Sequence, residues 1–440
     1  MKKKIRIGGG AGFSGDRLEP AVVLAEKGDL DYLVLECLAE RTIALAQKRK
    51  QADPSKGYDP LLERRIRSLL PHLVKNKVRL ITNMGAANPL AAVDKVLEIA
   101  KELHLSVKVA AVTGDDVFGQ IDPAQQAMET GRPLKEAGQL LSANAYIGID
   151  AILPALESGA DIIITGRVAD PSLFLAPMVY AFGWETDDYD FLGKGTVIGH
   201  LMECAGQITG GYFMDPGKKD VPNPAQLGFP IAEVSTDGSA VISKVNGTGG
   251  VINLMTSKEQ LLYEVVNPHE YYTPDVIADF TSVRLKEIGK DMVHVSGGGG
   301  KAKPATFKVS VGYQAFCLGE GEISYAGTNA LQKAKLAGQI IEERLKDRMD
   351  DLRVDLVGVN AIFRGAFDQQ IEPAEVRLRV AGRAQKMEVA SLVGEEVEAL
   401  YTNGPAGGGG ARKYVNEIVG IVSVLLGRGL VVPQVTVKEI

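Results

Sequence analysis

The chain is poor in cysteine and in aromatic residues. It has three cysteines in 440 residues, Cys37, Cys204 and Cys317, and they form no C-x-x-C pair. This odd, widely spaced set fits a reducing compartment and excludes a thiolate zinc knuckle. With 6% aromatic residues and one tryptophan, the core must be mostly aliphatic. A chain of this length can bury such a core without disulfides.

The sequence also lacks long apolar runs and an excess of positive charge. No run of about 18 apolar residues occurs, and the basic N-terminus is not followed by the apolar region of a secretory signal. Lys and Arg total 49 against 55 Asp and Glu, for a net charge of -6. We therefore expect a cytoplasmic protein that binds neither nucleic acid nor membranes.

Glycine, by contrast, is abundant, with 50 residues, and one cluster follows the first apolar segment. The spacing Gly10-x-Gly12-x-x-Gly15, with Glu36 after the next apolar run, satisfies the dinucleotide-binding fingerprint. Pro20 opposes that interpretation, because a helix opening inside the motif would carry this proline in its interior. We predict instead a long loop from Gly8 to Leu18 and a helix starting near Glu19. The loop residues expected to bind an anion are Gly10, Gly12, Ser14, Gly15 and Arg17.

Short apolar runs alternate with amphipathic helical stretches from Lys4 to about Ala181, which is typical of a parallel sheet covered by helices. The predicted strands are Ile5–Ile7, Tyr32–Leu35, Arg79–Thr82, Val107–Val112 and Ile162–Thr165. The predicted helices are Pro20–Lys27, Ala39–Lys50, Leu61–Lys75, Pro89–Leu103 and Asp150–Ser158. The pattern predicts an α/β fold, doubly wound by preference and barrel-like as the alternative.

The composition changes after residue 215. The stretch 215–230 is rich in proline and glycine, as linkers are, and beyond it strand patterns dominate around one long helical run, 330–348. We expect an α/β domain over 1–215 and an α+β domain over 230–440.

Polar residues follow several predicted strands, at the edge where α/β proteins build their sites. The candidates for binding substrate are Asn83 and Arg167, and the candidates for acid–base chemistry are Asp115 and Asp170. Turns and helix caps are polar in any protein, so part of this set is structural. Arg167 is the strongest candidate, as a rigid carboxylate or phosphate clamp, with an ion pair to Asp170 or Asp16 as the alternative.

Two further motifs are candidates. The predicted helix 196–207 carries His200 and Glu203 on a face without lysine or arginine, which fits either a cleft lining or a solvated surface. The cluster 407–410 precedes an apolar run, 414–426, that fits a helix. Gly408, Gly409 and Arg412 are therefore expected to bind an anion at a helix N-terminus, with a flexible hinge as the alternative.

The sequence resembles the acyclic terpene utilisation protein family, AtuA, over residues from about 5 to 415. The resemblance is carried by the motifs at 8–17, 83–85, 165–172, 199–204 and 402–407. It implies a place among proteins of terpenoid degradation, some of whose members lie in gene clusters acting on citronellol and geraniol through acyl-CoA intermediates. It does not imply a particular reaction.

Together these features predict an enzyme acting on a small carboxylate or acyl-CoA intermediate, of the lyase, hydratase or isomerase type. Arg17 and Arg167 would clamp the anion, and Asp115, Asp170, His200 and Glu203 are the acid–base candidates. The alternative is a non-catalytic subunit that binds a ligand or a pathway enzyme. No metal site is assigned, the cofactor is left open, and a homo-oligomer is expected.

Overall fold

The computed structural model describes residues 3–362 and 373–440. Their contacts form two compact units. The first comprises Met1–Leu134, Leu141–Gly312 and Ile421–Ile440, and the second Lys135–Leu140 and Tyr313–Gly420. The predicted linker 215–230 lies within the first unit, so the division at that linker stays a prediction.

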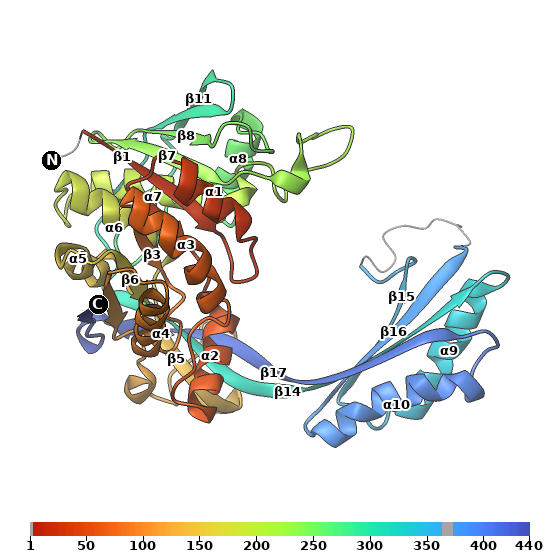
Figure 1. Ribbon diagram of the computed structural model, residues 1–440. Helices are drawn as coiled ribbons and strands as arrows, with labels where there is room; N and C mark the ends of the chain where they lie inside the picture. Colours follow the sequence, from red (N-terminus) through yellow and green to blue (C-terminus); the bar gives the residue numbers. More distant parts are fainter. Residues whose placement is uncertain (1–2, 363–372) are drawn as a thin grey trace. The chain divides into compact units, whose positions relative to one another are not determined.

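The first unit is built on a ten-stranded mixed sheet in the order β11-β12-β8-β7-β1-β2-β3-β6-β4-β18. Figure 1 labels several of its strands, among them β1, β7 and β8. Its five central strands run parallel to one another. They are β1 (Lys4–Ala11), β2 (Tyr32–Leu35), β3 (Arg79–Thr82), β4 (Lys108–Thr113) and β6 (Ile162–Thr165). Each overlaps one of the five predicted strands. Their side chains are almost all buried, as expected of parallel strands covered on both faces.

Two groups of helices pack against these strands. Leu33, Leu35 and Leu80 join one core with the first group, α1 (Glu19–Lys27), α3 (Leu62–Asn76) and α4 (Pro89–Glu102). The second group also packs together, and one of its members contacts β1 and β2. This group consists of α5 (Ile149–Glu157), α6 (Asp170–Phe182) and α7 (Tyr189–Glu203). The mixed α/β class is confirmed, and the described residues form no closed barrel. The doubly wound order of connections stays a prediction.

Antiparallel strands extend the sheet on both sides. On the β1 side lie β7 (Pro230–Ser235), β8 (Ala240–Lys244), β12 (Met292–Ser296) and β11 (Arg284–Gly289), and on the β4 side lies β18 (Gln434–Glu439). A small separate sheet contains β9 (Tyr271–Tyr272), β10 (Ile277–Asp279) and β13 (Gly299–Lys301). Two further helices are α2 (Glu40–Ala52) and α8 (Leu254–Leu262).

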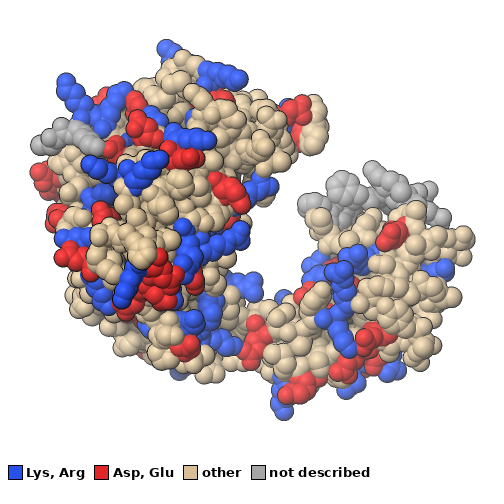
Figure 2. All heavy atoms as spheres, in the orientation of Figure 1, with Lys and Arg blue, Asp and Glu red and all other residues tan. Residues whose placement is uncertain are grey.

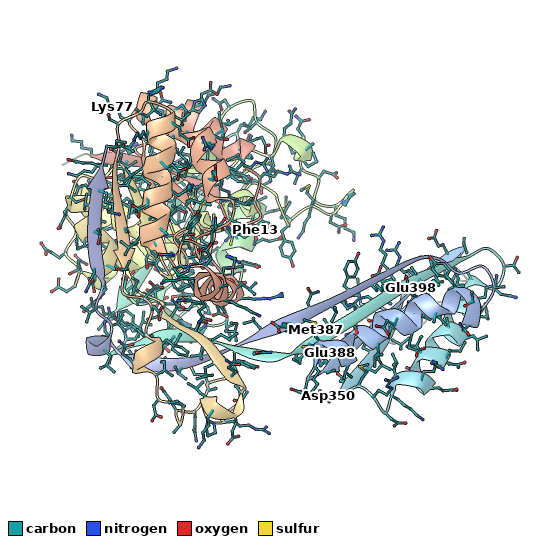
Figure 3. The ribbon with its side chains drawn as sticks, turned by 60° about the horizontal axis from the view of Figure 1, so that its bottom comes forward. Phe13, Lys77, Asp350, Met387, Glu388 and Glu398 are labelled. Atoms are coloured by element: carbon teal, nitrogen blue, oxygen red, sulfur yellow. The ribbon has the colours of Figure 1, made fainter. Side chains whose placement is uncertain are left out.

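The second unit has the β-α-β-β-α-β order of a ferredoxin-like fold. Its elements are β14 (Thr306–Ala326), α9 (Ala330–Leu345), β15 (Asp351–Val357), β16 (Glu375–Ala384), α10 (Met387–Asn403) and β17 (Gly409–Gly427). The strand order is β15-β16-β14-β17, and β5 (Gln139–Ala145) also pairs with β14. Both helices share one apolar core with the sheet. Figure 3 shows α10 with Met387 and Glu388 at its start. Strands β14 and β17 each continue into the first unit.

Two local predictions are wrong. The run 414–426 forms strand β17 and not a helix, because its β-branched residues also suit a strand paired along β14. Gly8, Gly9 and Gly10 lie within β1, and the loop begins at Gly12.

The helix start at Glu19 is confirmed. At the start of α4, Asn88 accepts from Ala91 N and Pro89 is the first helical residue. Asp170 is the first residue of α6, and Ala169 stands at its cap position.

Gly319 allows β14 to lie against α10, and we predict that Gly319→Ala destabilises the second unit by about 1–3 kcal/mol. A Cβ atom at this position would lie 1.8 Å from the carbonyl oxygen of Ala390 in the helix. Gly409→Ala is the control, because its Cβ would meet no atom within 4 Å. Urea unfolding of both variants measures the difference. Equal midpoints would show that the helix can move away from the strand without cost.

Candidate functional site

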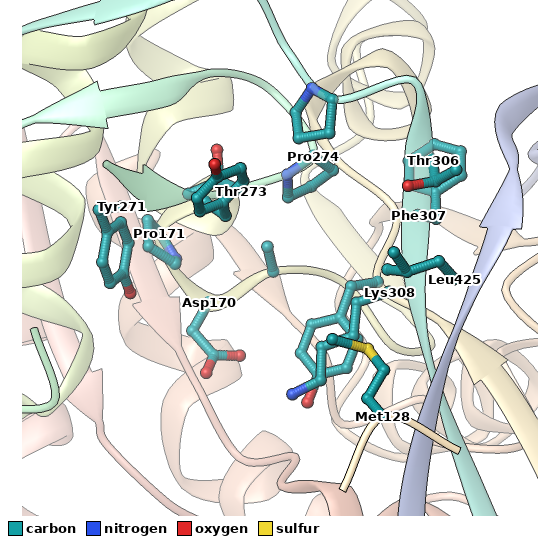
Figure 4. A pocket seen from close by; sticks show the side chains of 14 residues that line it. Met128, Asp170, Pro171, Tyr271, Thr273, Pro274, Thr306, Phe307, Lys308 and Leu425 are labelled. Carbon is teal, nitrogen blue, oxygen red and sulfur yellow. The ribbon is translucent and has the colours of Figure 1, made fainter. Parts of the chain in front are cut away.

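A cavity of about 520 Å³ lies in the first unit beside the loop that follows β6 (Figure 4). Two of the residues lining it are charged, Asp170 and Lys308. Its apolar walls include Met128, Pro171, Pro274, Pro304, Phe307 and Leu425, and hydroxyl groups come from Tyr146, Tyr271, Tyr272, Thr273 and Thr306. The volume lies in the range of small-molecule sites, and so does the combination of apolar walls with a few polar groups.

Asp170 is held by a buried arginine. Nη2 of Arg167 donates to Oδ1 of Asp170 over 2.9 Å, and the guanidinium lies 4.1 Å from the centre of the Tyr146 ring. Arg167 is 2% exposed, and its Nε and Nη1 have no hydrogen-bond partner among the described residues. Burial raises the pKa of Asp170 while Arg167 opposes that rise. The ion pair named above as the alternative role of Arg167 is therefore present, and its role as a ligand clamp stays a prediction.

Asp115 fixes the loop that carries Arg167. Its Oδ2 accepts from Arg167 N and from Asn144 Nδ2, both at 2.9 Å. A Cβ on Gly166 would lie 2.3 Å from Oδ1 of Asp115, so glycine is required for this approach. Burial raises the pKa of Asp115 to about 6. These contacts give Asp115 a positioning role, and an acid–base role for it stays a prediction.

Asn83 contacts Glu36, which the glycine motif suggested as a ribose ligand. Nδ2 of Asn83 donates to Oε1 of Glu36 over 3.0 Å, and Leu38 N donates to the same oxygen over 2.8 Å. Burial, and after it the charge of Asp170, raises the pKa of Glu36 to about 8. Glu36 therefore belongs to the Asp170 cluster, a role that its position directly after β2 could have suggested.

His200 and Glu203 form a buried pair on α7. His200 Nδ1 lies 2.8 Å from Glu203 Oε1, and the centre of its ring lies 5.4 Å from those of Tyr271 and Phe280. His200 Nε2 and Glu203 Oε2 are buried without a hydrogen-bond partner among the described residues. Burial raises the pKa of Glu203 to about 7, with His200 opposing. The face that carries them is thus buried and not solvated, and their catalytic role stays a prediction.

The wall formed by residues 271–274 is anchored by Asp275. Its Oδ1 accepts from Ile149 N at the start of α5, and its Oδ2 accepts from the Ser172 hydroxyl in α6. Burial raises the pKa of Asp275 to about 6. This carboxyl therefore ties the aromatic segment to the helices beside Asp170.

The glycine loop is closed on itself. Oδ2 of Asp16 accepts from Gly12 N, and Arg65 Nη2 donates to the carbonyl oxygens of Ser14 and Asp16. A Cβ on Gly12 would lie 2.6 Å from the carbonyl carbon of Cys204, so this glycine permits close packing against the end of α7.

Arg17 donates from Nη1 to the carbonyl oxygens of Pro224 and Ala225, and Gly10 is buried within β1. Anion binding by Gly10, Gly12, Ser14, Gly15 and Arg17 stays a prediction. None of these five residues lines the cavity described above.

Gly408, Gly409 and Arg412 belong to the second unit. They precede or begin β17, so the helix N-terminus expected there is absent, and that ground for anion binding is lost. Ala411 N donates instead to the Tyr401 hydroxyl.

Lys413 pairs with Glu398, which Figure 3 labels on α10. Over the visible face in Figure 2, lysine and arginine alternate with acidic residues. Among the described residues, no group of three or more His, Cys, Asp or Glu could hold a metal ion.

We predict that Arg167→Lys lowers the thermal stability of the first unit. Lysine keeps the charge but loses the planar group that stacks on Tyr146 and reaches Asp170, and we expect a loss of about 1–3 kcal/mol. The control is Arg17→Lys, whose side chain is exposed. A melting temperature equal to the parent's, combined with weaker ligand binding, would favour the clamp over the ion pair.

A family model described as acyclic terpene utilisation family protein AtuA matches residues 5–437. No curated protein and no solved structure matches the chain. No helix within residues 3–362 and 373–440 is long and apolar enough to cross a membrane.

Proposed function

Because the chain belongs to the acyclic terpene utilisation family AtuA, we propose that it is an enzyme acting on a small carboxylate or acyl-CoA intermediate of acyclic terpenoid breakdown. The reaction type proposed is that of a lyase, hydratase or isomerase. The observation that carries this proposal is the apolar cavity with Asp170 and Lys308 as its charged lining residues.

The cavity walls suit a branched hydrocarbon chain. Leu425, Met128 and Phe307 line it together with prolines, and burying apolar ligand surface against such side chains is favourable by about 25 cal/mol per Å². A ligand held there by its chain would leave its carboxyl or thioester end for the polar lining groups. A substrate with a short acyl chain and one carbonyl group would place the chain against the apolar walls and the carbonyl group against the polar groups.

Asp170 is the proposed general base. Its carboxylate borders the cavity and is 35% exposed, and Arg167 holds one of its oxygens. That arrangement favours the ionised form while the second oxygen can accept a proton from a carbon next to the substrate carbonyl. Removing such a proton begins an isomerisation or an elimination.

Lys308 is the proposed electrophile. Its Nζ lies 5.2 Å from the centre of the Tyr146 ring and donates to Glu40 Oε1 over 2.7 Å. The Tyr146 hydroxyl donates to the same oxygen over 2.6 Å. A cation held in this way can stabilise negative charge that develops on a carbonyl oxygen.

Ligand binding tests the substrate class. CoA esters of branched unsaturated acids, or the free acids, are expected to raise the melting temperature, whereas NAD(H), NADP(H) and FAD are not. A ligand at a hundredfold excess over its dissociation constant stabilises the native state by about 2.7 kcal/mol. A shift with a dinucleotide alone would contradict the proposal. A shift with CoA esters but no turnover by the purified protein would favour the non-catalytic subunit.

Asp170→Asn tests the base. The amide can still accept from Arg167 but cannot take a proton, so turnover is expected to fall by about 10²-fold or more while binding changes little. Asp187→Asn is the control, because Asp187 is an exposed carboxylate outside the cavity. Undiminished turnover in Asp170→Asn would require another base.

A further inference from the structure

Glu36 is a buried carboxyl group that accepts hydrogen bonds from the described residues at one of its two oxygens. It is 7% exposed, and its Oε1 accepts both Leu38 N and Asn83 Nδ2. Its Oε2 makes no hydrogen bond with the described residues. A second hydrogen bond sets the orientation of the Asn83 amide, because Cys37 N donates to Asn83 Oδ1 over 2.7 Å. Both N–H donors therefore stay on Oε1.

The guanidinium in this cluster is already paired. Arg167 donates to Asp170, and no hydrogen bond joins it to Glu36. An ionised Glu36 would be a buried carboxylate without a cationic hydrogen-bond partner, and two neutral N–H donors do not offset the cost of burying that charge. A proton on Glu36 removes this imbalance, and Oε2 is the oxygen left to carry it.

We propose that Glu36 is held as a neutral carboxylic acid, protonated on Oε2, and that its neutrality leaves Arg167 paired with the carboxylate of Asp170. Glu36 is thus a positioning residue that sets the charge state of the proposed base. Its catalytic consequence rests on the function proposed above, whereas its protonation does not.

The charges around Glu36 act in both directions on its pKa. Asp170 raises its pKa and Arg167 lowers it, and the end of α7 contributes Cys204 and Glu203 to the same cluster. Burial, the first cause, raises the pKa of Glu36 to about 8, above the ordinary value of 4.5. Stability that comes from the neutral form is therefore complete at low pH and is lost as the pH rises to about 8.

Infrared spectroscopy of the ligand-free protein tests the proposal directly. A protonated carboxyl group gives a carbonyl stretch that carboxylates lack, and labelling glutamate with ¹³C shifts the bands of glutamate and not those of aspartate. We expect a labelled band at pH 7 that disappears with a midpoint near pH 8. Glu36→Gln should lack the component of this band that titrates near pH 8, and Glu185→Gln, an exposed control, should keep it.

Glu203 is the other buried glutamate of the cluster, and its variant keeps the test decisive. Glu203→Gln should retain the component that titrates near pH 8. If Glu36→Gln fails to fold, Glu203→Gln alone decides, because loss of that component there would assign it to Glu203. A band unchanged in Glu36→Gln, or no labelled band at pH 7, would overturn the proposal.

Unfolding against pH gives a second readout. A single proton bound by the folded state changes the free energy of unfolding by at most about 1.4 kcal/mol per pH unit. Glu36→Gln should remove that slope between pH 7 and 8. With a substrate, the pH dependence of turnover in Glu36→Gln should lose its alkaline limb near pH 8. Absence of turnover in the parent protein would contradict the proposed function and leave the infrared result standing, because that measurement needs no substrate.

Discussion

The pairing of Arg167 with Asp170 is the interaction on which the rest of the candidate site depends. Arg167 is 2% exposed, and a buried guanidinium needs partners for its charge. Here the Asp170 carboxylate pairs with it, and the Tyr146 ring lies against it. Asp115 fixes the backbone of Arg167 from one side, and Asp275 fixes the helix that carries Asp170 through Ser172. Both anchors are buried carboxyl groups. The cavity wall is thus tied to the sheet through polar contacts inside an otherwise aliphatic core.

Much of the first unit could be predicted from the sequence because its local signals agree with its tertiary structure. The run Ile162–Thr165 is apolar at every position before its final threonine, and it is a central parallel strand. Pro20 and Pro89 mark helix starts because a proline in the first turn costs no intrahelical hydrogen bond. The run 414–426 is different. Its apolar spacing fits a helix, and only pairing with the distant β14 decides for a strand.

Some residues of the candidate site could be predicted from the sequence and others could not, because only some have a local signal. Asn83, Arg167 and Asp170 could be found because each follows a strand of the parallel sheet, and such ends share one edge. Glu36 also follows a strand, but the glycine motif predicted a ribose-binding role for it. That Gly12 is required by the backbone of Cys204, nearly two hundred residues away, is a tertiary fact with no local signal. Glycine patterns alone do not separate close packing from ligand binding.

Charge balance connects these observations to chemistry. Burial raises the pKa of Glu36, Glu203 and Asp170, and together they face one guanidinium and one imidazole. All three carboxyl groups cannot be ionised at once without leaving buried negative charge unpaired. Asp170 is paired with an arginine and also lines the cavity. It is therefore the carboxyl group best placed to stay ionised and to contact a ligand. Neighbouring carboxyl groups whose environments separate their protonation states are a recurrent basis of acid–base catalysis. The arrangement around Arg167 fits that basis, with Asp170, the base proposed above, beside an apolar wall.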